Sequence, residues 1–590
     1  MYNCGLIKFK FLGKSNALNH SQLMENRKPA TGGWLYEPIL PNSKDWPIMQ
    51  LANDRTKFLA ELELYVFDKV KTDFKTQTEL NDELASVLFH EKLRVKQNPW
   101  KADPKDEKEF WRGIEKKFIK LKNAINPDSP HTEDSILKDI IHRYISEIAG
   151  TFDPFTYDIT KKLVTQWMSR LLNAGSGRKI TEIWKVTEHL HDKIQLLGEI
   201  DLIRELAKDH TIIMVPTHFS NLDSPLIGWA IQSLGLPPFL YGAGLNLFGI
   251  GMFGYFMEKL GAYKVDRRKK NTIYLEALKG YSTLSMHRGC HSLFFPGGTR
   301  SRSGAIETKL KLGLLGTALE AQRLNYEKAE SKDKVKKLFV VPVVINYNFV
   351  LEAPGLIDEH LKISGQKRYF RENDDYASSY KLAWFIFKLI TASSEMALTF
   401  GRPTDLWGNE IDNHGNSLDK TGKQIDIERY FYSGGKNTRD LQRDGEYTKL
   451  LGSDITKKYL KYNHIYPSHL VAFVAFEILR KRYSKLDLFS FLRLDEEDQV
   501  IPKKEFQEVI EQFIGVLKQM RDEGKCMIDR RFDTHSTERL IELGIRHLGV
   551  YHPKRPLLAK NNGDIVTQDF NLLYFYHNRM EGYGLGKLVK

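Results

Sequence analysis

The sequence predicts an α/β protein whose core is a mainly parallel sheet flanked by helices, with helical regions before and after it. Between residue 211 and about residue 407, short apolar runs of strand length alternate with helical patterns, an order typical of parallel sheets. On either side of this segment, apolar residues recur mostly at helical spacing. The chain of 590 residues also exceeds one ordinary core, so we expect more than one domain.

These patterns divide the chain into three expected parts. They are a helical N-terminal region over 1–205, an α/β domain over 206–407, and a turn-rich insertion with a helical C-terminal region over 408–590. The strands expected in the middle part are 211–215, 239–241, 262–265, 292–295, 338–345 and 397–400. A helical pattern over 271–287 is one of those that separate them.

In the N-terminal region, the apolar residues follow the period of an amphipathic helix. One such face is formed by Phe58, Leu62, Tyr65 and Val66. The apolar residues from Ile180 to Leu197 fall at similar spacing, so the helical pattern is expected to continue up to the first strand of the middle part.

The C-terminal part begins with a seven-residue repeat of Gly, Asn and Asp over 408–426. A calcium loop is one reading of this repeat, but its acidic residues lack the ligand spacing and the closing glutamate of an EF-hand. Tandem turns are therefore favoured. Helices are expected further on, at 470–479 and 506–520.

Composition narrows the class of protein. With 41% hydrophobic and 28% charged residues, the chain is not mainly disordered. Its net charge of +13 suits phosphate-bearing substrates or anionic lipid surfaces. Nucleic acid is not an expected partner, because the basic residues are dispersed and form no recognised binding motif. The 3 cysteines are far apart, which favours a reducing compartment without a disulfide framework or a zinc site.

Two stretches of the sequence are relevant to whether the protein enters or binds a membrane. The first residues of the chain lack a long apolar core and a convincing cleavage site, so no signal peptide is expected. Residues 224–257 carry no charge, but glycines and prolines interrupt them throughout. This density of helix breakers argues against a spanning helix. We expect a peripheral or monotopic protein on the cytoplasmic face of a membrane.

A histidine and an aspartate follow the first expected strand of the middle part. His218 and Asp223 lie on a strand-to-helix loop, where α/β proteins often place their chemistry. Ser224 is a possible N-cap, with Pro225 at the first helical position. A carboxylate that orients an imidazole produces a good general base. The alternative is that Asp223 simply caps the helix.

Two basic segments follow later strands. Residues 259–270 end a strand in four consecutive cations before a helix, an arrangement suited to phosphate, although a solvated charge run has the same pattern. Residues 293–304 run from a strand through Pro-Gly-Gly into Thr-Arg-Ser-Arg. Glycine lets a backbone approach a ligand, while guanidinium groups and hydroxyls bind phosphate. Here the alternative is a surface turn with chance arginines.

A fourth segment, residues 340–348, is an apolar strand around Pro342. The order and spacing of the four segments resemble the glycerolipid acyltransferases, which acylate glycerol 3-phosphate or 1-acylglycerol 3-phosphate. The matching blocks are His-x4-Asp, Gly-Ala-aromatic followed by arginine, Phe-Pro-Glu-Gly-x-Arg-Ser-Arg, and Val-Pro-Val. The resemblance covers residues 205–405 and implies an α/β acyltransferase core that works at membranes. The long N-terminal region and C-terminal extension look more like the glycerol-3-phosphate members.

The resemblance also implies roles for individual residues. His218 and Asp223 would be catalytic. The residues implied to bind the phosphorylated acceptor are Arg267 or Arg268, with Gly298, Thr299, Arg300, Ser301 and Arg302. One residue departs from the family pattern, because Gly297 stands where the third block has a glutamate.

The function expected from these residues is transfer of a fatty acyl group from acyl-CoA or acyl-carrier protein to glycerol 3-phosphate, without a metal or another cofactor. In this mechanism His218 removes the proton of the acceptor hydroxyl, and backbone N–H groups near Thr299 or in the 218–224 loop stabilise the oxyanion. Alternatives are a 1-acylglycerol-3-phosphate acyltransferase, a hydrolase that uses the same base on water, and a non-catalytic membrane-binding scaffold.

Overall fold

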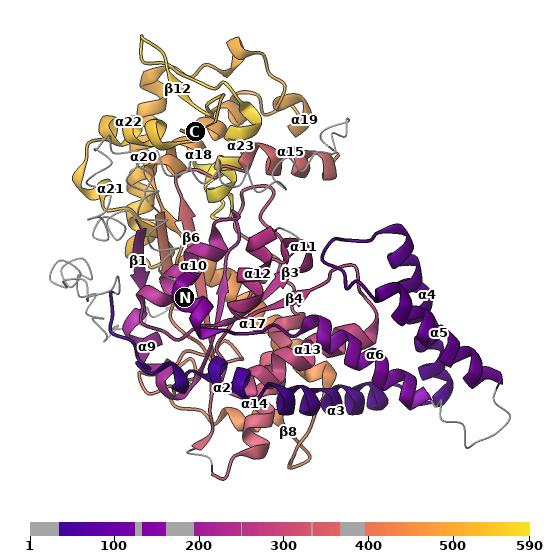
Figure 1. The fold of residues 1–590 in the computed structure, drawn as a ribbon. Coiled ribbons are helices and arrows are strands. Elements are labelled where there is room, and N and C mark those ends of the chain that lie inside the picture. The colour runs from indigo at the N-terminus through magenta and orange to yellow at the C-terminus, as the bar shows by residue number, and fades with distance from the viewer. Residues whose placement is uncertain are drawn as a thin grey trace, which may run out of the picture.

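The computed structural model describes residues 35–123, 133–160, 194–248, 251–331, 334–365, 396–550 and 552–589. At its centre lies a seven-stranded sheet with the strand order β1-β7-β6-β2-β5-β3-β4 (Figure 1). Its strands are β1 (Ile194–Gly198), β2 (Thr211–Pro216), β3 (Leu240–Gly244), β4 (Ala262–Val265), β5 (Ser292–Leu293), β6 (Leu338–Tyr347) and β7 (Met396–Phe400).

The sheet is mainly parallel, as the sequence predicts. β6, β2, β5, β3 and β4 run in one direction. β7 is antiparallel to β6 and parallel to β1, so these two strands run in the opposite direction. All residues of β2 and β6 are buried, which explains why both read as continuous apolar runs.

The sequence-based expectation for residues 194–197 was wrong. The apolar spacing from Ile180 to Leu197 predicts a helix, but the structure has strand β1 at the end of this segment, paired with β7 from Ile194↔Met396 to Gly198↔Phe400. A five-residue apolar run fits either element, and here pairing with a strand far along the chain decides. The part of this pattern before Ile194 lies outside the described residues.

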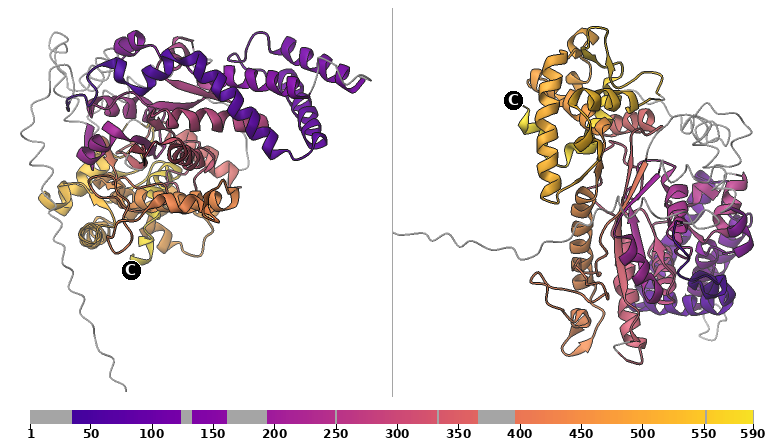
Figure 2. Two further views of the ribbon diagram at one scale, coloured as in Figure 1. Left: turned by 90° about the horizontal axis from the view of Figure 1, so that it is seen from below. Right: turned by 90° about the vertical axis from the view of Figure 1, so that its left-hand side faces the viewer.

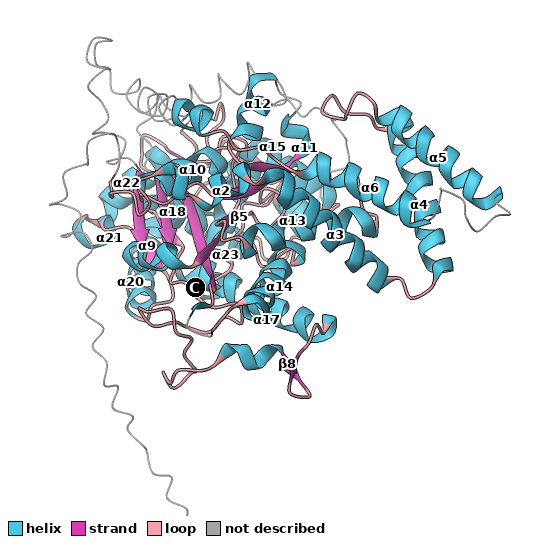
Figure 3. Ribbon diagram, turned by 60° about the horizontal axis from the view of Figure 1, so that its bottom comes forward, coloured by secondary structure: helices cyan, strands magenta, loops and turns pink. Residues whose placement is uncertain are grey.

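Helices of the middle part connect and cover these strands (Figure 3). They are α9 (Ile200–Asp209), α10 (Asp223–Ser233), α11 (Leu245–Phe248), α12 (Gly251–Lys259), α13 (Thr272–His287), α14 (Gly313–Lys328) and α15 (Ala353–Ile363). The uncharged stretch 224–257 is thus divided among α10, β3, α11 and most of α12. Within the described residues, no helix has both the length and the hydropathy to cross a membrane.

The N-terminal region is helical, as expected. It contains η1 (Ser43–Asp45), α2 (Pro47–Asn53), α3 (Arg55–Asp73), α4 (Gln77–Gln97), α5 (Glu107–Asn123) and α6 (Glu133–Ile148). Phe58, Leu62 and Val66 on α3 are buried and belong to a core that also includes residues of α6 and α13. The predicted face of α3 is therefore the face that packs against the middle part. The expectation of no signal peptide concerns residues outside the described ranges.

The C-terminal region begins with turns. Asp405, Asp412 and Asp419 each accept backbone N–H groups two and four residues further along, so the repeat forms the expected tandem turns. The remaining elements are η5 (Ile427–Phe431), β8 (Tyr432–Ser433), β9 (Lys436–Asn437), α17 (Leu441–Lys461), β10 (His464–Ile465), α18 (Pro467–Arg482), α19 (Leu488–Phe491), η6 (Glu496–Gln499), α20 (Lys503–Asp522), β11 (Met527–Ile528), α21 (Arg531–Thr534), α22 (Thr537–His547), β12 (Leu558–Ala559), β13 (Ile565–Val566), α23 (Phe570–Glu581) and η7 (Leu585–Leu588).

The C-terminal region packs on the sheet as well as on itself. α18 lies among α20, α22 and α23, and both expected helices are confirmed as parts of α18 and α20. Figure 2 shows α17 and the C-terminal helices on one side of the sheet and the N-terminal helices on the other. Their contacts are continuous with the sheet core, because Tyr459 of α17 donates a hydrogen bond to the Val215 carbonyl of β2 at 2.9 Å. The C-terminal region therefore lies close to the strand that precedes His218.

Candidate active site

The candidate active site lies at the carboxyl ends of the parallel strands. β2 leads into His218, β5 into the Pro296–Arg302 turn, β6 ends at Tyr347, and β4 leads into Arg267. β5 and β6 are the two neighbours of β2, so three of these loops begin side by side. Parallel strands bring residues that are distant in the sequence to one edge of a sheet, which is where open α/β sheets bind ligands.

Asp223 orients the imidazole of His218. Its Oδ2 lies 2.7 Å from His218 Nδ1 and accepts the backbone N–H groups of Phe219 and Ser220 at 2.6 and 2.9 Å. Its Oδ1 accepts the Tyr347 hydroxyl at 2.5 Å, and the Asp223 side chain is fully buried. The two backbone N–H groups and the Tyr347 hydroxyl fix this side chain in place, and an oxygen acceptor beside Nδ1 favours the tautomer in which His218 Nδ1 carries the proton. His218 Nε2 is then the basic atom.

The ring of His218 is also fixed from its face. Phe295, the residue before the Pro-Gly-Gly turn, stacks on the imidazole with ring centroids 4.3 Å apart. The His218 side chain remains 19% exposed, which lets a substrate reach it. The imidazole is thus held by a carboxylate at one edge and an aromatic ring on one face.

Helix α10 starts earlier than the sequence predicts. Its first residue is Asp223, its N-cap is Leu222, and no side chain caps it. Ser224 is therefore not the N-cap and Pro225 stands third, still in the first turn, where proline removes no helical hydrogen bond. The Asp223 carboxylate points back to the loop before it, so its role is to hold this loop and His218, not to cap α10.

The Pro-Gly-Gly turn is hydrogen-bonded directly to residues 218–223 after β2, here called the histidine loop. The Ser301 N–H donates to the His218 carbonyl at 2.7 Å. Gly298 has a φ of +76°, a backbone conformation that favours glycine. Through Ser301, the turn that contains Gly298 and Thr299 thus lies next to His218.

Arg300 and Arg302 are partly exposed and lie beside acidic residues of the α15 segment. Arg300 Nη1 is 3.4 Å from Glu352 Oε1, and Arg302 Nε is 2.7 Å from Glu359 Oε1. The guanidinium of Arg302 is close enough to that of Arg267 for its charge to lower the pKa of Arg267, although partial burial is the larger cause. Guanidinium groups that are near enough to affect each other's pKa together favour the binding of an anion.

Arg268 is directed elsewhere. Its guanidinium forms ion pairs with Asp266 and Asp103, donates to the Asn98 carbonyl, and lies 3.9 Å from the Trp100 ring. Its side chain is only 8% exposed. Arg268 thus binds the α4–α5 connection to the middle part, so of the two residues left open by the sequence, Arg267 is the one that stays a candidate for phosphate binding.

Glu352 is a site residue that the sequence analysis missed. It precedes α15 and accepts the Asn221 N–H at 2.8 Å and the Ser220 hydroxyl at 3.1 Å. Burial raises the pKa of this carboxyl, although the Asn221 N–H and the Arg300 charge oppose the shift. No local motif marks Glu352. Its contacts link the histidine loop to Arg300.

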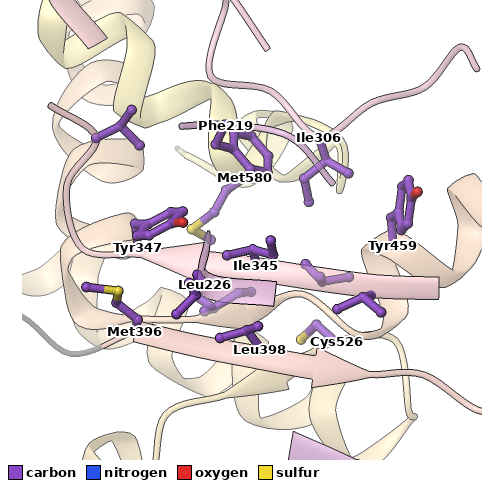
Figure 4. Close-up of a cluster of buried hydrophobic side chains, with 14 of the residues drawn as sticks. Phe219, Leu226, Ile306, Ile345, Tyr347, Met396, Leu398, Tyr459, Cys526 and Met580 are labelled. Carbon is purple, nitrogen blue, oxygen red and sulfur yellow. The ribbon is translucent and has the colours of Figure 1, made fainter. Parts of the chain in front are cut away.

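Arg579 of α23 is a second residue without a local signal. Its guanidinium lies 3.8 Å from the ring centroid of Phe219, and Nη2 donates to the Ile345 carbonyl at 2.6 Å. Figure 4 shows Phe219 of the histidine loop and Met580 of α23 on the same face of β6. Burial lowers the pKa of Arg579 to about 10, so this cation is still charged at neutral pH. The C-terminal region therefore contributes a buried charge behind the catalytic loop.

The backbone donors of the histidine loop are already bound. The N–H groups of residues 218–223 all donate to acceptors within the protein. Among the described residues, the N–H groups of Thr299 and Arg300 have no such acceptor. Of the two places considered for an oxyanion-binding donor, the turn at Thr299 is thus the one with unbound donors.

Known proteins resemble this part of the chain. Residues 199–346 match the family model described as Acyltransferase. The glycerol-3-phosphate acyltransferase of Xanthomonas axonopodis pv. citri (strain 306) is 26% identical over 213 residues, which are 36% of this chain and 22% of that protein. The glycerol-3-phosphate acyltransferase of Histophilus somni (strain 129Pt) is 31% identical over 153 residues, 26% of this chain and 18% of that protein.

A third relative, the glycerol-3-phosphate acyltransferase of Alteromonas mediterranea, is 30% identical over 209 residues, 35% of this chain and 24% of that protein. The chain thus spans less than a quarter of the length of these curated relatives. Residues 199–346 include strands β2 to β5, nearly all of β6, and the loops that carry His218, Arg267 and Arg302. The central α/β domain is therefore similar to acyltransferases over residues 199–346, and these relatives are named glycerol-3-phosphate acyltransferases.

Proposed function

We propose that this protein is an O-acyltransferase that moves a fatty acyl group from a thioester donor to a hydroxyl of glycerol 3-phosphate. One observation carries the proposal: His218, held by Asp223 through Nδ1, lies at the same edge of the sheet as the loops that carry Arg267, Arg300 and Arg302. A base and an anion site at one edge suit an acceptor that has both a hydroxyl and a phosphate.

The histidine is the proposed general base. His218 Nε2 takes the proton of the acceptor hydroxyl, and the oxygen attacks the thioester carbonyl carbon. When the tetrahedral intermediate collapses, the carbon–sulfur bond breaks and the imidazolium returns the proton to the leaving thiolate. Asp223 stabilises the imidazolium in between, and this is supported by its buried hydrogen bond to Nδ1.

The arginines are proposed to bind the acceptor phosphate. Arg267 and Arg302 would each offer a planar guanidinium, and Arg300 lies on the same turn as Arg302. A bound phosphate fixes the distance between the acceptor hydroxyl and His218 and so supplies part of the rate. The N–H groups at Thr299 and Arg300 are proposed to stabilise the oxyanion, since they have no acceptor among the described residues.

We propose further that the enzyme binds a membrane surface, because its acyl substrate and its product are amphiphilic. Phe155 and Tyr255 support this, since they are 72% and 57% exposed. The segments that carry them run side by side, joined by the bridge between Phe152 and Leu260. Aromatic side chains on such a surface are suited to the interface of a bilayer.

The test is a transfer assay with the purified chain of 590 residues. Radiolabelled acyl-CoA or acyl-carrier protein is supplied with glycerol 3-phosphate or with 1-acylglycerol 3-phosphate, and the lipid formed is identified. We expect 1-acylglycerol 3-phosphate from the first acceptor, no product from the His218→Ala variant, and normal yield from the His414→Ala variant, whose side chain is exposed.

Three outcomes would contradict the proposal. If only 1-acylglycerol 3-phosphate gave a product, the protein would be a 1-acylglycerol-3-phosphate acyltransferase, the alternative considered above. Free fatty acid formed at the same rate with and without acceptor would indicate a hydrolase. Lipid binding without any turnover would favour the scaffold.

A further inference from the structure

We propose that Glu307 supplies the carboxyl group that is missing at position 297, and that it positions the His218 loop for catalysis. This inference rests on the proposed acyltransferase function. It explains the one departure from the motif Phe-Pro-Glu-Gly-x-Arg-Ser-Arg, in which Gly297 stands at the glutamate position. The carboxyl group is then provided by a residue ten positions further along the chain.

The space beside Gly297 is occupied by Glu307. A Cβ built on Gly297 would lie 3.1 Å from Glu307 Cγ and 3.2 Å from Glu307 Oε1. Unlike Gly298, Gly297 does not have a positive φ, so its backbone accepts an ordinary side chain. The neighbouring Glu307 side chain, not the backbone, is therefore what crowds a side chain at position 297.

The turn folds back on itself, which explains how Glu307 reaches this place. The Ser301 hydroxyl donates to the Ala305 carbonyl at 2.7 Å, and the Lys311 N–H donates to the Pro296 carbonyl at 2.7 Å. Between them Gly304 has a φ of +82°, and a Cβ there would meet the Phe575 carbonyl oxygen of α23. The chain thus bends against the C-terminal region and returns to Pro296, with Glu307 inside the closed loop.

The carboxyl group of Glu307 contacts the catalytic residue. Its Oε1 accepts the backbone N–H of His218 at 2.8 Å. Its Oε2 is buried and has no hydrogen-bond partner among the described residues. A hydrogen bond to the backbone of His218 sets the position of the loop from which the imidazole projects, so Glu307 is a positioning residue.

The carboxyl group of Glu307 is surrounded by protein atoms, with one oxygen bonded to the His218 N–H and the other buried. Burial raises its pKa to about 7, while the His218 N–H and the charges of Arg579 and His218 oppose the shift. A side chain at position 297 would begin with its Cβ 3.2 Å from Glu307 Oε1, so a second carboxyl group there would compete with Glu307 for the same space.

This geometry predicts that positions 297 and 307 are coupled. Glu307→Ala should lower kcat by about 10- to 100-fold with a small change in the KM for glycerol 3-phosphate, since a displaced base slows chemistry more than it weakens phosphate binding. Glu307→Gln, which keeps an oxygen acceptor for the His218 N–H, should retain most of the activity. Gly297→Glu alone should also lower kcat, because the new side chain competes with Glu307 for one space.

The deciding variant is the exchange Gly297→Glu with Glu307→Ala. If the inference is correct, the double variant recovers at least about tenfold in kcat over Glu307→Ala, so the two changes are strongly non-additive. Additive losses in the double variant would overturn the inference. Lys309→Ala, an exposed change in the same loop, is the matched control and should leave kcat and KM unchanged.

A second measurement separates this inference from the proposed function. If the unmodified chain forms no acylated product, the proposed function fails, but the coupling can still be read from thermal unfolding. Gly297→Glu should then lower the unfolding midpoint, and adding Glu307→Ala should restore it at least in part. A double variant less stable than either single variant would overturn the shared site, whatever the activity.

Discussion

Arg579 holds Phe219, the residue that follows His218: its guanidinium lies 3.8 Å from the ring centroid of Phe219 and donates to the backbone of Ile345. The three residues belong to α23, the histidine loop and β6. The Arg579 side chain therefore connects the end of the C-terminal region to the carboxyl ends of β2 and β6. The C-terminal region is part of the structure that supports His218, and its removal should affect catalysis.

Arg579→Met should lower both stability and kcat. The variant loses the cation–π contact and the hydrogen bond to Ile345, and a desolvated cation–π contact contributes about 2 kcal/mol. Urea unfolding measures the free energy of unfolding, and the transfer assay measures kcat. Arg530→Met, an exposed arginine of the same region, is the control. Equal behaviour of the two variants would show that α23 does not support the loop.

His218→Ala and Asp223→Asn should lower kcat by about 10²–10⁴-fold, the usual cost of losing a general base or its orientation. His218→Ala should leave the unfolding midpoint nearly unchanged. Asp223→Asn should destabilise the loop as well, because Asp223 also binds two backbone N–H groups and the Tyr347 hydroxyl. Asp209→Asn is an exposed control. A folded His218→Ala variant with normal turnover would contradict the assignment.

Substitutions of the neighbouring residues Arg267 and Arg268 should affect different properties, namely substrate binding for Arg267 and stability for Arg268. Arg267→Ala should raise the KM for glycerol 3-phosphate by about 10- to 100-fold, as expected when a charge-assisted hydrogen bond is lost. Arg300→Ala and Arg302→Ala should act in the same direction, with partial rescue by lysine. Arg268→Ala should instead lower the unfolding midpoint, because Arg268 joins Asp103 and Asp266. If Arg268→Ala alone raised this KM, the phosphate would lie on the other side of β4.

The raised pKa of Glu307 makes stability depend on pH in a stated direction. Its folded value of about 7 lies above its ordinary value of 4.5, so the folded protein binds this proton more tightly than the unfolded chain. The contribution is fully present below pH 4.5 and is lost as the pH rises through 7. Between these values, urea unfolding of the Glu307→Gln variant should show a smaller fall in stability than the unmodified chain.

Glu320 provides a control of opposite sign. Its ion pairs with Arg323 and Lys69 overcome the effect of burial and lower its pKa from 4.5 to about 2. Its contribution is present above pH 4.5 and is lost as the pH falls through 2. Glu320→Gln should therefore alter the acid side of the stability profile and leave the slope between pH 4.5 and 7 unchanged. A change of that slope would contradict the assignment to Glu307.

Phe155→Ser together with Tyr255→Ser should reduce binding to phospholipid vesicles without altering the unfolding midpoint, since both side chains are exposed. Vesicle co-sedimentation measures the bound fraction, and each large aromatic group removed costs about 1.5–3 kcal/mol of apolar burial where it is fully inserted. Phe89→Ser, an exposed aromatic of α4, is the control. Equal loss from both sets would show that the membrane surface lies elsewhere.

The sequence by itself determined where most strands of the sheet lie and which loops after them carry the candidate site residues. β2 and β6 could be predicted because strands buried in a sheet are continuous apolar runs bounded by polar loops. His218, Asp223 and the Thr299–Arg302 turn follow such runs, and parallel strands place the loops at their carboxyl ends on one edge. These features depend on residues close in sequence.

Tertiary structure alone decided which of these residues meet. The direction of Arg268, the pairing of β1 with β7, and the contacts of Glu307 and Arg579 with the histidine loop each depend on a partner far along the chain or on a loop that folds back. Local periodicity records whether a residue is buried, but it does not record against what. The identity of the carboxyl group beside Gly297 was therefore fixed only when the chain folded, because one space accepts one side chain from whichever segment reaches it.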